Sequence, residues 1–254
     1  MKFYFSGVKS VTELSWLKAA RVSRLLVDPF DFKQILKLTH PLPFALSLDS
    51  GGYRVWKQGG QINLDQYLQL AISYPFTWVA SPDQIGDAQT SYQNWLYAKQ
   101  WLADHTPHPP LLVPVWHWAT SSYSLERYLD QNWYVGIGAL VPFMRRGRSK
   151  SPSERRQALA QLLILQALCQ DYPHRFHLFG CCWLEALDRL KHTAWGADSS
   201  HWLAGAKYGW IIHTSKRTGK LTYTHYRNLN FASSRRDRCI ACAANLETHL
   251  NQQQ

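Results

Sequence analysis

Short runs of apolar residues alternate with longer amphipathic stretches along almost the whole chain. Four or five apolar residues between turn residues predict a strand, and apolar residues that recur every three or four positions predict a helix. The predicted strands are 3–6, 24–27, 44–48, 76–80, 111–115, 134–137, 175–179, 194–197 and 210–213. The predicted helices are 11–20, 31–39, 63–73, 86–103, 122–130, 152–171 and 181–191. Ser151, Pro152 and Glu154 are typical of the first turn of a helix, with Ser151 as N-cap.

Strands that alternate with helices indicate βαβ units and a parallel sheet. Eight or nine such strands in 254 residues favour an α/β fold of the (βα)8 TIM-barrel type. A doubly wound sheet is less favoured, because no glycine-rich dinucleotide fingerprint follows the early strands. We expect the barrel over residues 1–213 and a short basic C-terminal extension over residues 214–254.

The composition indicates a globular protein with an anionic partner. Hydrophobic residues make up 46% of the chain, which excludes disorder, and 28 Lys and Arg against 17 Asp and Glu leave a net charge of +11. No apolar run approaches the roughly 20 residues of a membrane-spanning helix, so we expect no membrane contact. The N-terminus is unlike a secretory signal, and five cysteines are too few for a disulfide scaffold. These features predict a cytoplasmic protein.

The carboxyl ends of the predicted strands carry three carboxylates. Asp49 follows the strand at 44–48, Asp83 comes soon after the strand at 76–80, and Asp198 follows the strand at 194–197. Catalytic groups of TIM barrels lie at this end of the strands. Retaining glycosyl chemistry needs two carboxylates, one that attacks the anomeric carbon and one that transfers a proton. Asp49 and Asp198 are the candidate pair.

Glycines and an aromatic residue beside these carboxylates favour a flat ligand such as a nucleobase. Gly51 and Gly138 let backbone N–H groups approach such a ligand, and Tyr53 offers a ring for stacking. Structural interpretations stay open. The segment that begins at Asp49 is typical of a turn, and Asp198 before two serines is typical of a helix N-cap. The position of three carboxylates after strands on one face favours the functional interpretation.

Residues 44–242 resemble the tRNA-guanine transglycosylase (queuine tRNA-ribosyltransferase) superfamily, whose members exchange guanine in a nucleic acid for a 7-deazaguanine. The segment from Asp49 to Tyr53 resembles the Asp-Ser-Gly-Gly-aromatic motif of that family, in which the aspartate is the acid/base group and the aromatic ring stacks on the base. Asp198 is similar to the family's nucleophile, which forms a covalent ribosyl-enzyme intermediate. The resemblance therefore implies a pentosyltransferase that acts by double displacement.

The resemblance also implies a set of base-binding residues. Asp83 falls where the family keeps an aspartate that accepts hydrogen bonds from guanine. Gly138 and Ala139 resemble a Gly-Gly segment whose amides meet the base, with Ala139 in place of one glycine. A Gln-Gly segment of the family is replaced around His117, which either donates a hydrogen bond to the ligand or is a packed rim residue. The expected set is Ser50, Gly51, Tyr53, Asp83, His117, Gly138 and Ala139.

The extension resembles a partial form of the family's zinc module. The Cys-x-Cys-x-x-Cys of the family becomes Asp237-x-Cys239-x-x-Cys242, and His249 is the candidate for a distant ligand. A lone Cys-x-x-Cys favours a pair of reduced thiols without metal, and the alternative is a zinc cofactor on Cys239, Cys242 and His249. The short chain and partial zinc module are closer to the divergent DpdA-type branch, which inserts deazapurines into DNA. Both tRNA and DNA are therefore candidate substrates.

Two clusters of cations follow the strands of the candidate site. The expected nucleic-acid-binding residues are Arg145, Arg146, Arg148, Lys216, Arg217, Arg235 and Arg236. A solvated surface usually mixes charges of both signs, whereas these clusters are almost entirely positive. They favour a surface that binds the phosphates of a nucleic acid, because Lys and Arg bind phosphates with release of counterions.

The sequence thus predicts an enzyme that exchanges guanine in tRNA or DNA for a 7-deazaguanine base. Its expected partners are the nucleic acid, the free base, and either a second copy of the chain or a partner subunit. Two alternatives stay open. One is a base-excising N-glycosidase, in which water replaces the incoming base. The other is a non-catalytic, nucleic-acid-binding partner of an active transglycosylase, which the presence of both Asp49 and Asp198 disfavours.

Overall fold

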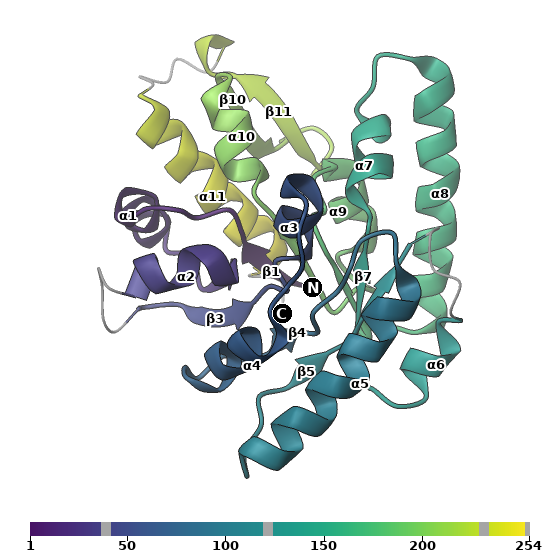
Figure 1. Cartoon of the computed structure of the whole chain (residues 1–254). Coiled ribbons are helices and arrows are strands. Elements are labelled where there is room, and N and C mark those ends of the chain that lie inside the picture. Colours follow the sequence, from purple (N-terminus) through teal and green to yellow (C-terminus); the bar gives the residue numbers. More distant parts are fainter. Residues whose placement is uncertain (37–41, 119–123, 229–233, 252–254) are drawn as a thin grey trace.

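The computed structural model describes residues 1–36, 42–118, 124–228 and 234–251. Its centre is a parallel sheet in the order β5-β4-β3-β2-β1-β9-β8-β7-β6, with helices around it (Figure 1). The strands are β1 (Lys2–Phe5), β2 (Arg24–Val27), β3 (Ala45–Leu48), β4 (Val79–Ala80), β5 (Leu112–Val113), β6 (Val115–His117), β7 (Val135–Gly138), β8 (Phe176–Leu178) and β9 (Gly196–Ser199). This is the predicted α/β fold of the TIM-barrel type.

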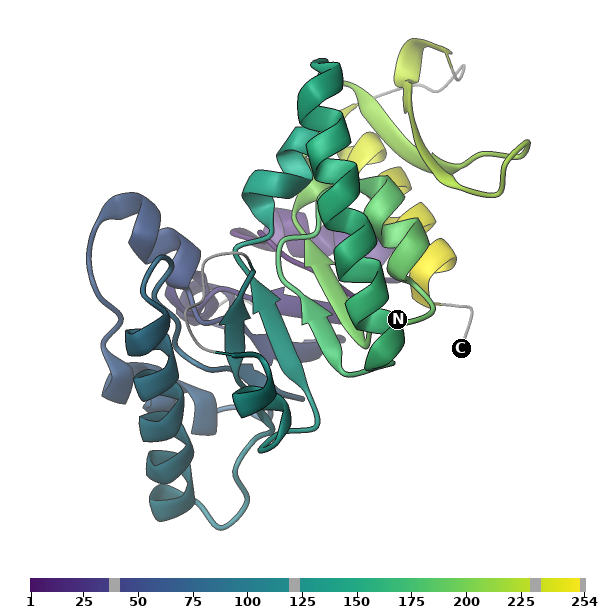
Figure 2. The same ribbon diagram turned by 90° about the vertical axis from the view of Figure 1, so that its right-hand side faces the viewer.

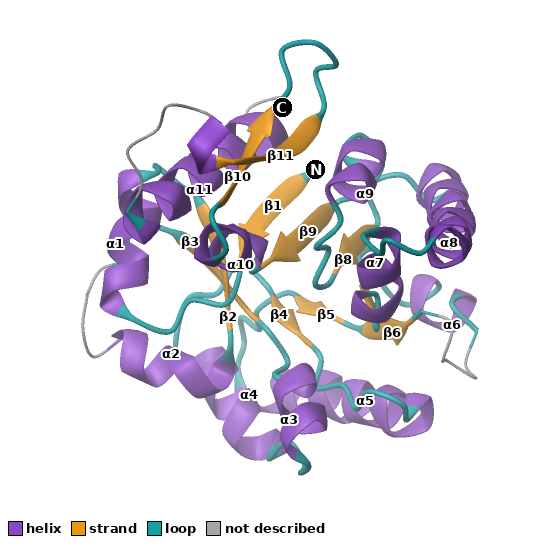
Figure 3. Cartoon of the chain, turned by 90° about the horizontal axis from the view of Figure 1, so that it is seen from above, coloured by secondary structure: helices purple, strands orange, loops and turns teal. Residues whose placement is uncertain are grey.

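The two ends of this sheet meet at Pro114. Strand β5 pairs with β4 and β6 pairs with β7, and only Pro114 separates β5 from β6. Proline has no N–H to continue a ladder, and the next N–H, that of Val115, donates to Ser81 Oγ at 3.1 Å. β5 and β6 thus follow each other like one interrupted strand, and the nine-stranded sheet curves into a nearly closed barrel (Figure 3).

Helices cover the outside of the barrel. They are α1 (Val11–Ala19), α2 (Pro29–Leu36), α3 (Gly52–Gln58), α4 (Leu64–Ile72), α5 (Ala88–His105), α6 (Glu126–Leu129), α7 (Val141–Gly147), α8 (Pro152–Asp171), α9 (Leu184–Leu190), α10 (His201–Lys207) and α11 (Arg235–Asn251), with a 3-10 turn at Tyr226–Asn228. Within the described residues, each helix is too short or too polar to span a lipid bilayer.

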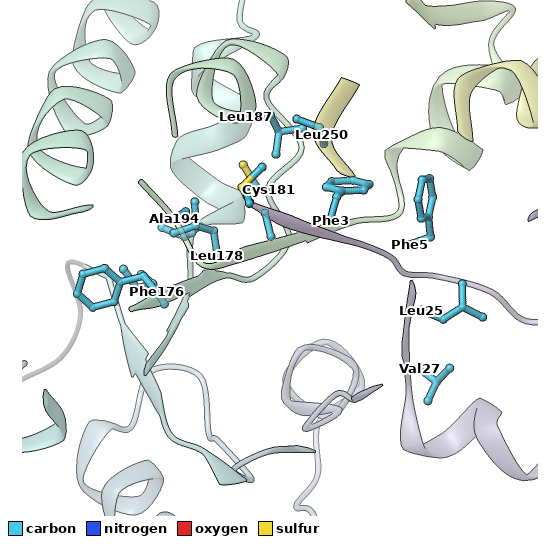
Figure 4. Packing of buried hydrophobic residues seen from close by; sticks show 14 of the residues in the cluster. Phe3, Phe5, Leu25, Val27, Phe176, Leu178, Cys181, Leu187, Ala194 and Leu250 are labelled. Atoms are coloured by element: carbon cyan, nitrogen blue, oxygen red, sulfur yellow. The ribbon is translucent and has the colours of Figure 1, made fainter. Parts of the chain in front are cut away.

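Alternate residues of the strands pack into two different cores. Phe3 and Phe5 of β1 pack outward between the barrel and the helices, together with outward residues of the other strands (Figure 4). Tyr4, between them, packs inside the barrel with Trp78, and their ring centres lie 5.4 Å apart. Trp195 joins the same inner cluster. Large side chains therefore fill the inside of the barrel below its carboxyl end.

The apolar run at 210–213 is not a further strand of the barrel. It belongs to β10 (Trp210–Thr214), which pairs antiparallel with β11 (Leu221–His225) in a separate hairpin that projects from the barrel (Figure 2). Within the described residues, β10 and β11 pair with each other in a sheet of their own and with no strand of the barrel. The pattern predicted a strand correctly, but not its partner.

Most predicted helices form, and α8 matches its predicted bounds. The Ser151 side chain accepts a hydrogen bond from the Glu154 N–H, as predicted for the N-cap. Residues 37–39 and 122–123 of two predicted helices lie outside the described residues. The helices α3, α7, α10 and α11 were not predicted.

Helix α11 places much of the predicted extension against the barrel. It contacts β1, α1, α10 and β10. Its last residue, Asn251, pairs with both backbone groups of Phe3, since its Oδ1 accepts from the Phe3 N–H at 2.7 Å and its Nδ2 donates to the Phe3 carbonyl at 3.2 Å. The end of the described chain is therefore fixed to the first strand.

Candidate functional site

Three carboxylates gather at the carboxyl end of the barrel. Asp198 lies in β9, Asp49 directly follows β3, and Asp83 follows β4 after two residues. The charges of Asp198 and Asp83 both act on Asp49, which places the three side chains in one electrostatic neighbourhood. Since the layers below are filled with aromatic rings, this end of the barrel is the candidate site for a polar ligand.

Asp198 is surrounded by hydrogen-bond donors. Its Oδ1 accepts from the Gly180 backbone N–H at 3.0 Å and lies 3.3 Å from His177 Nε2, and its Oδ2 accepts from the Ser6 hydroxyl at 2.9 Å. Contacts on both oxygens fix the orientation of this carboxylate. Asp198 is 5% exposed and caps no helix, so the N-cap interpretation is wrong. The arrangement suits a carboxylate that acts as a nucleophile.

Asp49 is in a different environment, partly buried and with few donors. Its Oδ1 accepts from the Ser50 N–H at 2.9 Å. Burial, and then the charges of Asp198 and Asp83, raise the pKa of Asp49 well above its ordinary range. A carboxyl group with a raised pKa holds a proton at a higher pH and can act as a general acid. Two neighbouring carboxylates in such contrasting environments are suited to opposite roles.

Asp83 is the centre of a buried hydrogen-bond group. The Ser50 hydroxyl donates to its Oδ1, and His117 Nε2 lies 2.7 Å from its Oδ2. The Gly52 N–H donates to Ser50 Oγ at 3.1 Å. His117 is 2% exposed and Asp83 is 7% exposed. Of the two interpretations of His117, the structure therefore favours the packed residue, which positions Asp83.

Three positions in this region require glycine for different structural reasons. Gly51 has a φ of +77°, which side chains disfavour. A Cβ on Gly52 would lie 2.5 Å from Asp83 Oδ1, and a Cβ on Gly138 would lie 2.8 Å from the His117 ring. The Asp-Ser-Gly-Gly segment is a tight turn, as its composition predicts, and it also packs directly on Asp83.

Ala139 has a φ of +57°, a conformation that favours glycine. It lies just past the end of β7 at the same end of the barrel, beside Gly138. Tyr53, at the start of α3, is 43% exposed, and the centre of its ring is 5.9 Å from that of Trp56. Its ring is thus available for stacking from solvent.

All seven predicted nucleic-acid-binding cations are exposed. None of them forms a salt bridge with a carboxylate in the described parts of the chain. Arg148 does have an internal role, because its Cζ lies 5.7 Å from the centre of the Tyr223 ring and its Nη1 lies 3.4 Å from His201 Nδ1. Burial, and then the charge of Arg148, lower the pKa of His201 to about 4, so this ring is neutral at pH 7.

The predicted zinc ligands lie on α11 but are not brought together. Cys239 and Cys242 are buried one turn apart, and the Ile212 N–H donates to Cys242 Sγ at 3.3 Å. His249 lies about 10 Å further along the helix, with its Nε2 2.6 Å from Asp188 Oδ1. No three His, Cys, Asp or Glu side chains within the described ranges could share a metal ion. These residues do not fit one zinc site, and zinc binding stays a prediction.

Several residues of the site were not predicted from the sequence. Ser6, His177 and the Gly180 N–H surround Asp198. Asp28, which adds to the raised pKa of Asp49, forms an ion pair with Arg54 at 3.1 Å. Ser6 and Asp28 do lie at the ends of predicted strands, so the rule that found Asp49 also marks them. His177 had a weaker signal, a single polar residue within an apolar strand.

No family model matches the chain, and no curated protein is significantly similar to it in sequence.

Proposed function

We propose that this protein exchanges guanine in a nucleic acid for a 7-deazaguanine base, through a covalent bond between the ribosyl group and Asp198. The observation that carries the proposal is the pair of carboxylates at one end of the barrel. Asp198 accepts hydrogen bonds on both oxygens, whereas burial and neighbouring carboxylates raise the pKa of Asp49. Retaining glycosyl transfer needs one carboxylate that attacks the anomeric carbon and a second carboxyl group that donates a proton.

In the first step, Asp198 Oδ2 attacks C1′ of the nucleoside, and the bond from C1′ to N9 of guanine breaks. The leaving guanine takes a proton from Asp49. In the second step, Asp49, now a carboxylate, removes the N9 proton of the incoming 7-deazaguanine. This N9 attacks C1′ and releases Asp198. Two displacements at C1′ retain its configuration, and the proton returns to Asp49.

Asp83 supports recognition of a purine edge. One hydrogen bond to each of its oxygens, from Ser50 and from His117, leaves further lone pairs to accept from N–H groups of a base. Its position is rigid, because Gly52 packs against it and both partners are buried. The backbone at Gly138 and Ala139 and the ring of Tyr53 would complete the contacts with the base.

The exposed cations without a carboxylate partner support a nucleic acid as the carrier of the exchanged base. An exposed arginine or lysine without a carboxylate partner is available to phosphates, which bind through counterion release. A base inside a duplex is out of reach of a barrel, so the target is expected to be flipped out or single-stranded. The five cysteines form no disulfide, as suits the cytoplasmic location that we propose with this activity.

The test is incorporation of radiolabelled guanine into bulk tRNA, duplex DNA and single-stranded DNA. We expect label in one polymer with the wild-type protein and none with Asp198→Asn. Asp104→Asn, an exposed carboxylate on α5, is the matched control and should incorporate as much label as wild type. Full incorporation by Asp198→Asn would refute the nucleophile.

Two other outcomes would replace the proposal. Release of free guanine without incorporation would identify a base-excising N-glycosidase. Tight, salt-sensitive binding with neither release nor incorporation would favour the partner subunit.

A further inference from the structure

A cavity of about 340 Å³ lies beside the carboxylates and takes no part in the steps above. Its walls are α3, the segment 59–64 that leads into α4, and the segment 83–94 that includes the start of α5. Gly52 and Asp83 line it. Asp83 is also the residue that we propose to recognise the edge of the target base. The cavity and the candidate active site therefore share a wall.

The lining favours an uncharged ligand with hydrogen-bonding edges. Among the described residues, no lysine, arginine or histidine lines the cavity, and both oxygens of its one carboxylate, Asp83, already accept hydrogen bonds. Val55, Ile62 and Ile85 supply apolar surface. The remaining polar lining includes the amides of Gln61, Gln84 and Asn94, whose side chains make no hydrogen bond within the described residues. Phosphates do not suit this lining, whereas heteroaromatic groups do.

One residue that lines this cavity has an exposed aromatic ring. Trp56, which lines it, is 57% exposed, and Tyr53 on the same helix is 43% exposed. Their ring centres are 5.9 Å apart with an interplanar angle of 36°. Exposed aromatic rings beside a groove are the usual platforms on which proteins stack the bases of single-stranded nucleic acids.

We infer that this cavity holds the base of the nucleotide next to the one that is exchanged. The inference rests on the proposed function, which brings the target base to Asp83. The neighbouring base of the same strand then lies within reach of the cavity on the other side of that wall. Trp56 stacks on this second base, and the amides of Gln61, Gln84 and Asn94 contact its edges. Such a contact also holds the strand open while the target base leaves the stack.

The inference is tested with short single-stranded DNA and RNA oligonucleotides that contain one guanosine. Each is made intact and with an abasic residue on either side of that guanosine, and binding is measured by fluorescence anisotropy. With the wild-type protein we expect one abasic position to weaken binding about ten-fold. Trp56→Ala should bind the intact oligonucleotide about ten-fold more weakly than wild type does. In this variant the abasic residue should cause no further loss of affinity.

Two variants control for the loss of a tryptophan. Trp56→Phe keeps an aromatic ring and should recover most of the binding. Trp133→Ala removes a tryptophan that is 67% exposed and precedes β7, at the opposite end of the barrel, and should bind like wild type. Equal abasic effects in wild type and Trp56→Ala would overturn the inference, as would wild-type protein that binds none of the oligonucleotides. Guanine that binds alone in equilibrium dialysis, with loss in Trp56→Ala and no abasic effect, would assign the cavity to the free base instead.

Failure of this inference is distinguishable from failure of the proposed function. Incorporation of labelled guanine by wild type, without coupling between Trp56 and the abasic position, would refute the flanking-base site alone. Coupling without incorporation would refute the exchange reaction and leave the flanking-base site in place.

Discussion

At the scale of single residues, the site depends on the contrast between two aspartates. Asp198 has a backbone N–H, a hydroxyl and an imidazole around it, and Asp49 has one backbone N–H and three carboxylate neighbours, of which Asp28 is the third. The side chains are chemically identical, so their different roles come from what the barrel places around each one.

The raised pKa of Asp49 predicts how its replacement changes stability with pH. A carboxyl group whose pKa is raised by folding stabilises the protein below its ordinary pKa, and this stability is lost as the pH rises through the folded-state value. At pH 7, Asp49→Asn should therefore be more stable than wild type in urea unfolding, and the difference should shrink as the pH falls. The same variant should lose about 10²- to 10⁴-fold in exchange activity.

Asp104→Asn serves as the control in these unfolding measurements, since Asp104 is exposed. A lower stability of Asp49→Asn than of wild type at pH 7 would contradict the raised pKa.

Two glycines predict opposite effects of the same substitution. A Cβ on Gly52 would lie 2.5 Å from Asp83 Oδ1 and 2.8 Å from the Asp83 carbonyl oxygen, so Gly52→Ala should destabilise the protein by about 1–3 kcal/mol. A Cβ on Gly205, within α10, would meet no atom closer than 3.8 Å, and Gly205→Ala should stabilise it by up to about 1 kcal/mol. Urea unfolding of both variants measures this. Equal effects would show that the contact with Asp83 is not tight.

At the scale of elements, the barrel strands were predictable because each is a short, strongly apolar run. The run at 194–197 forms β9 two residues later, at Gly196–Ser199, so Asp198 lies within a strand rather than after it. Helices α3 and α10 were missed because each begins with glycine or polar turn residues and has only seven residues. Propensity gives little signal over so short a length, and packing decides.

The candidate site was predictable only in part, for a related reason. Asp49, Asp83 and Asp198 follow apolar runs, which makes their shared end of the barrel visible in the sequence. The pairing of Asp83 with His117 joins residues 34 positions apart, and that of Ser6 with Asp198 joins residues 192 positions apart. The order of the strands around the barrel decides which residues become such partners. Local sequence patterns do not reveal this order.

The contact between α11 and β1 predicts a specific loss of stability. Asn251 pairs with both backbone groups of Phe3 and donates to Glu247 Oε2 at 2.7 Å. Asn251→Ala should lower the free energy of unfolding by about 1–3 kcal/mol, because it leaves the Phe3 N–H without its partner. Thr248→Ala, an exposed position on the same helix, should change it by less than about 0.5 kcal/mol. Equal stability of the two variants in urea would show that this pair does not hold α11.

At the scale of the whole molecule, net charge and its distribution decide which partners approach the barrel. The chain carries +11, and exposed arginines without carboxylate partners lie on α7, directly after β7. The candidate site itself holds several aspartates in one neighbourhood. A polyanion would therefore be held by the exposed cations rather than by the aspartates of the candidate site.

This distribution predicts the salt dependence of nucleic-acid binding. Each phosphate contact that is lost should reduce the slope of log K against log salt by about 1. Arg145→Gln combined with Arg146→Gln should therefore reduce the slope by about 2 and weaken binding to all sequences alike. Lys99→Gln, an exposed cation on α5, is the matched control. A slope equal to that of wild type would remove α7 from the binding surface.

The pairing of the first strand, β1, with β9, which lies late in the chain, has a consequence for protein synthesis. β1 pairs with β9 along its whole length, and Ser6, just past β1, donates to Asp198. A ribosome-bound chain that has produced β1 to β8 therefore holds Asp49 and Asp83 but has no Asp198, and its first strand pairs with β2 on one edge while its other edge lacks β9. Contacts of such long range form last and slowly. Truncated or unfinished chains would thus lack one of the three carboxylates of the candidate site, and one edge of β1 would remain open to chaperones until translation is nearly complete.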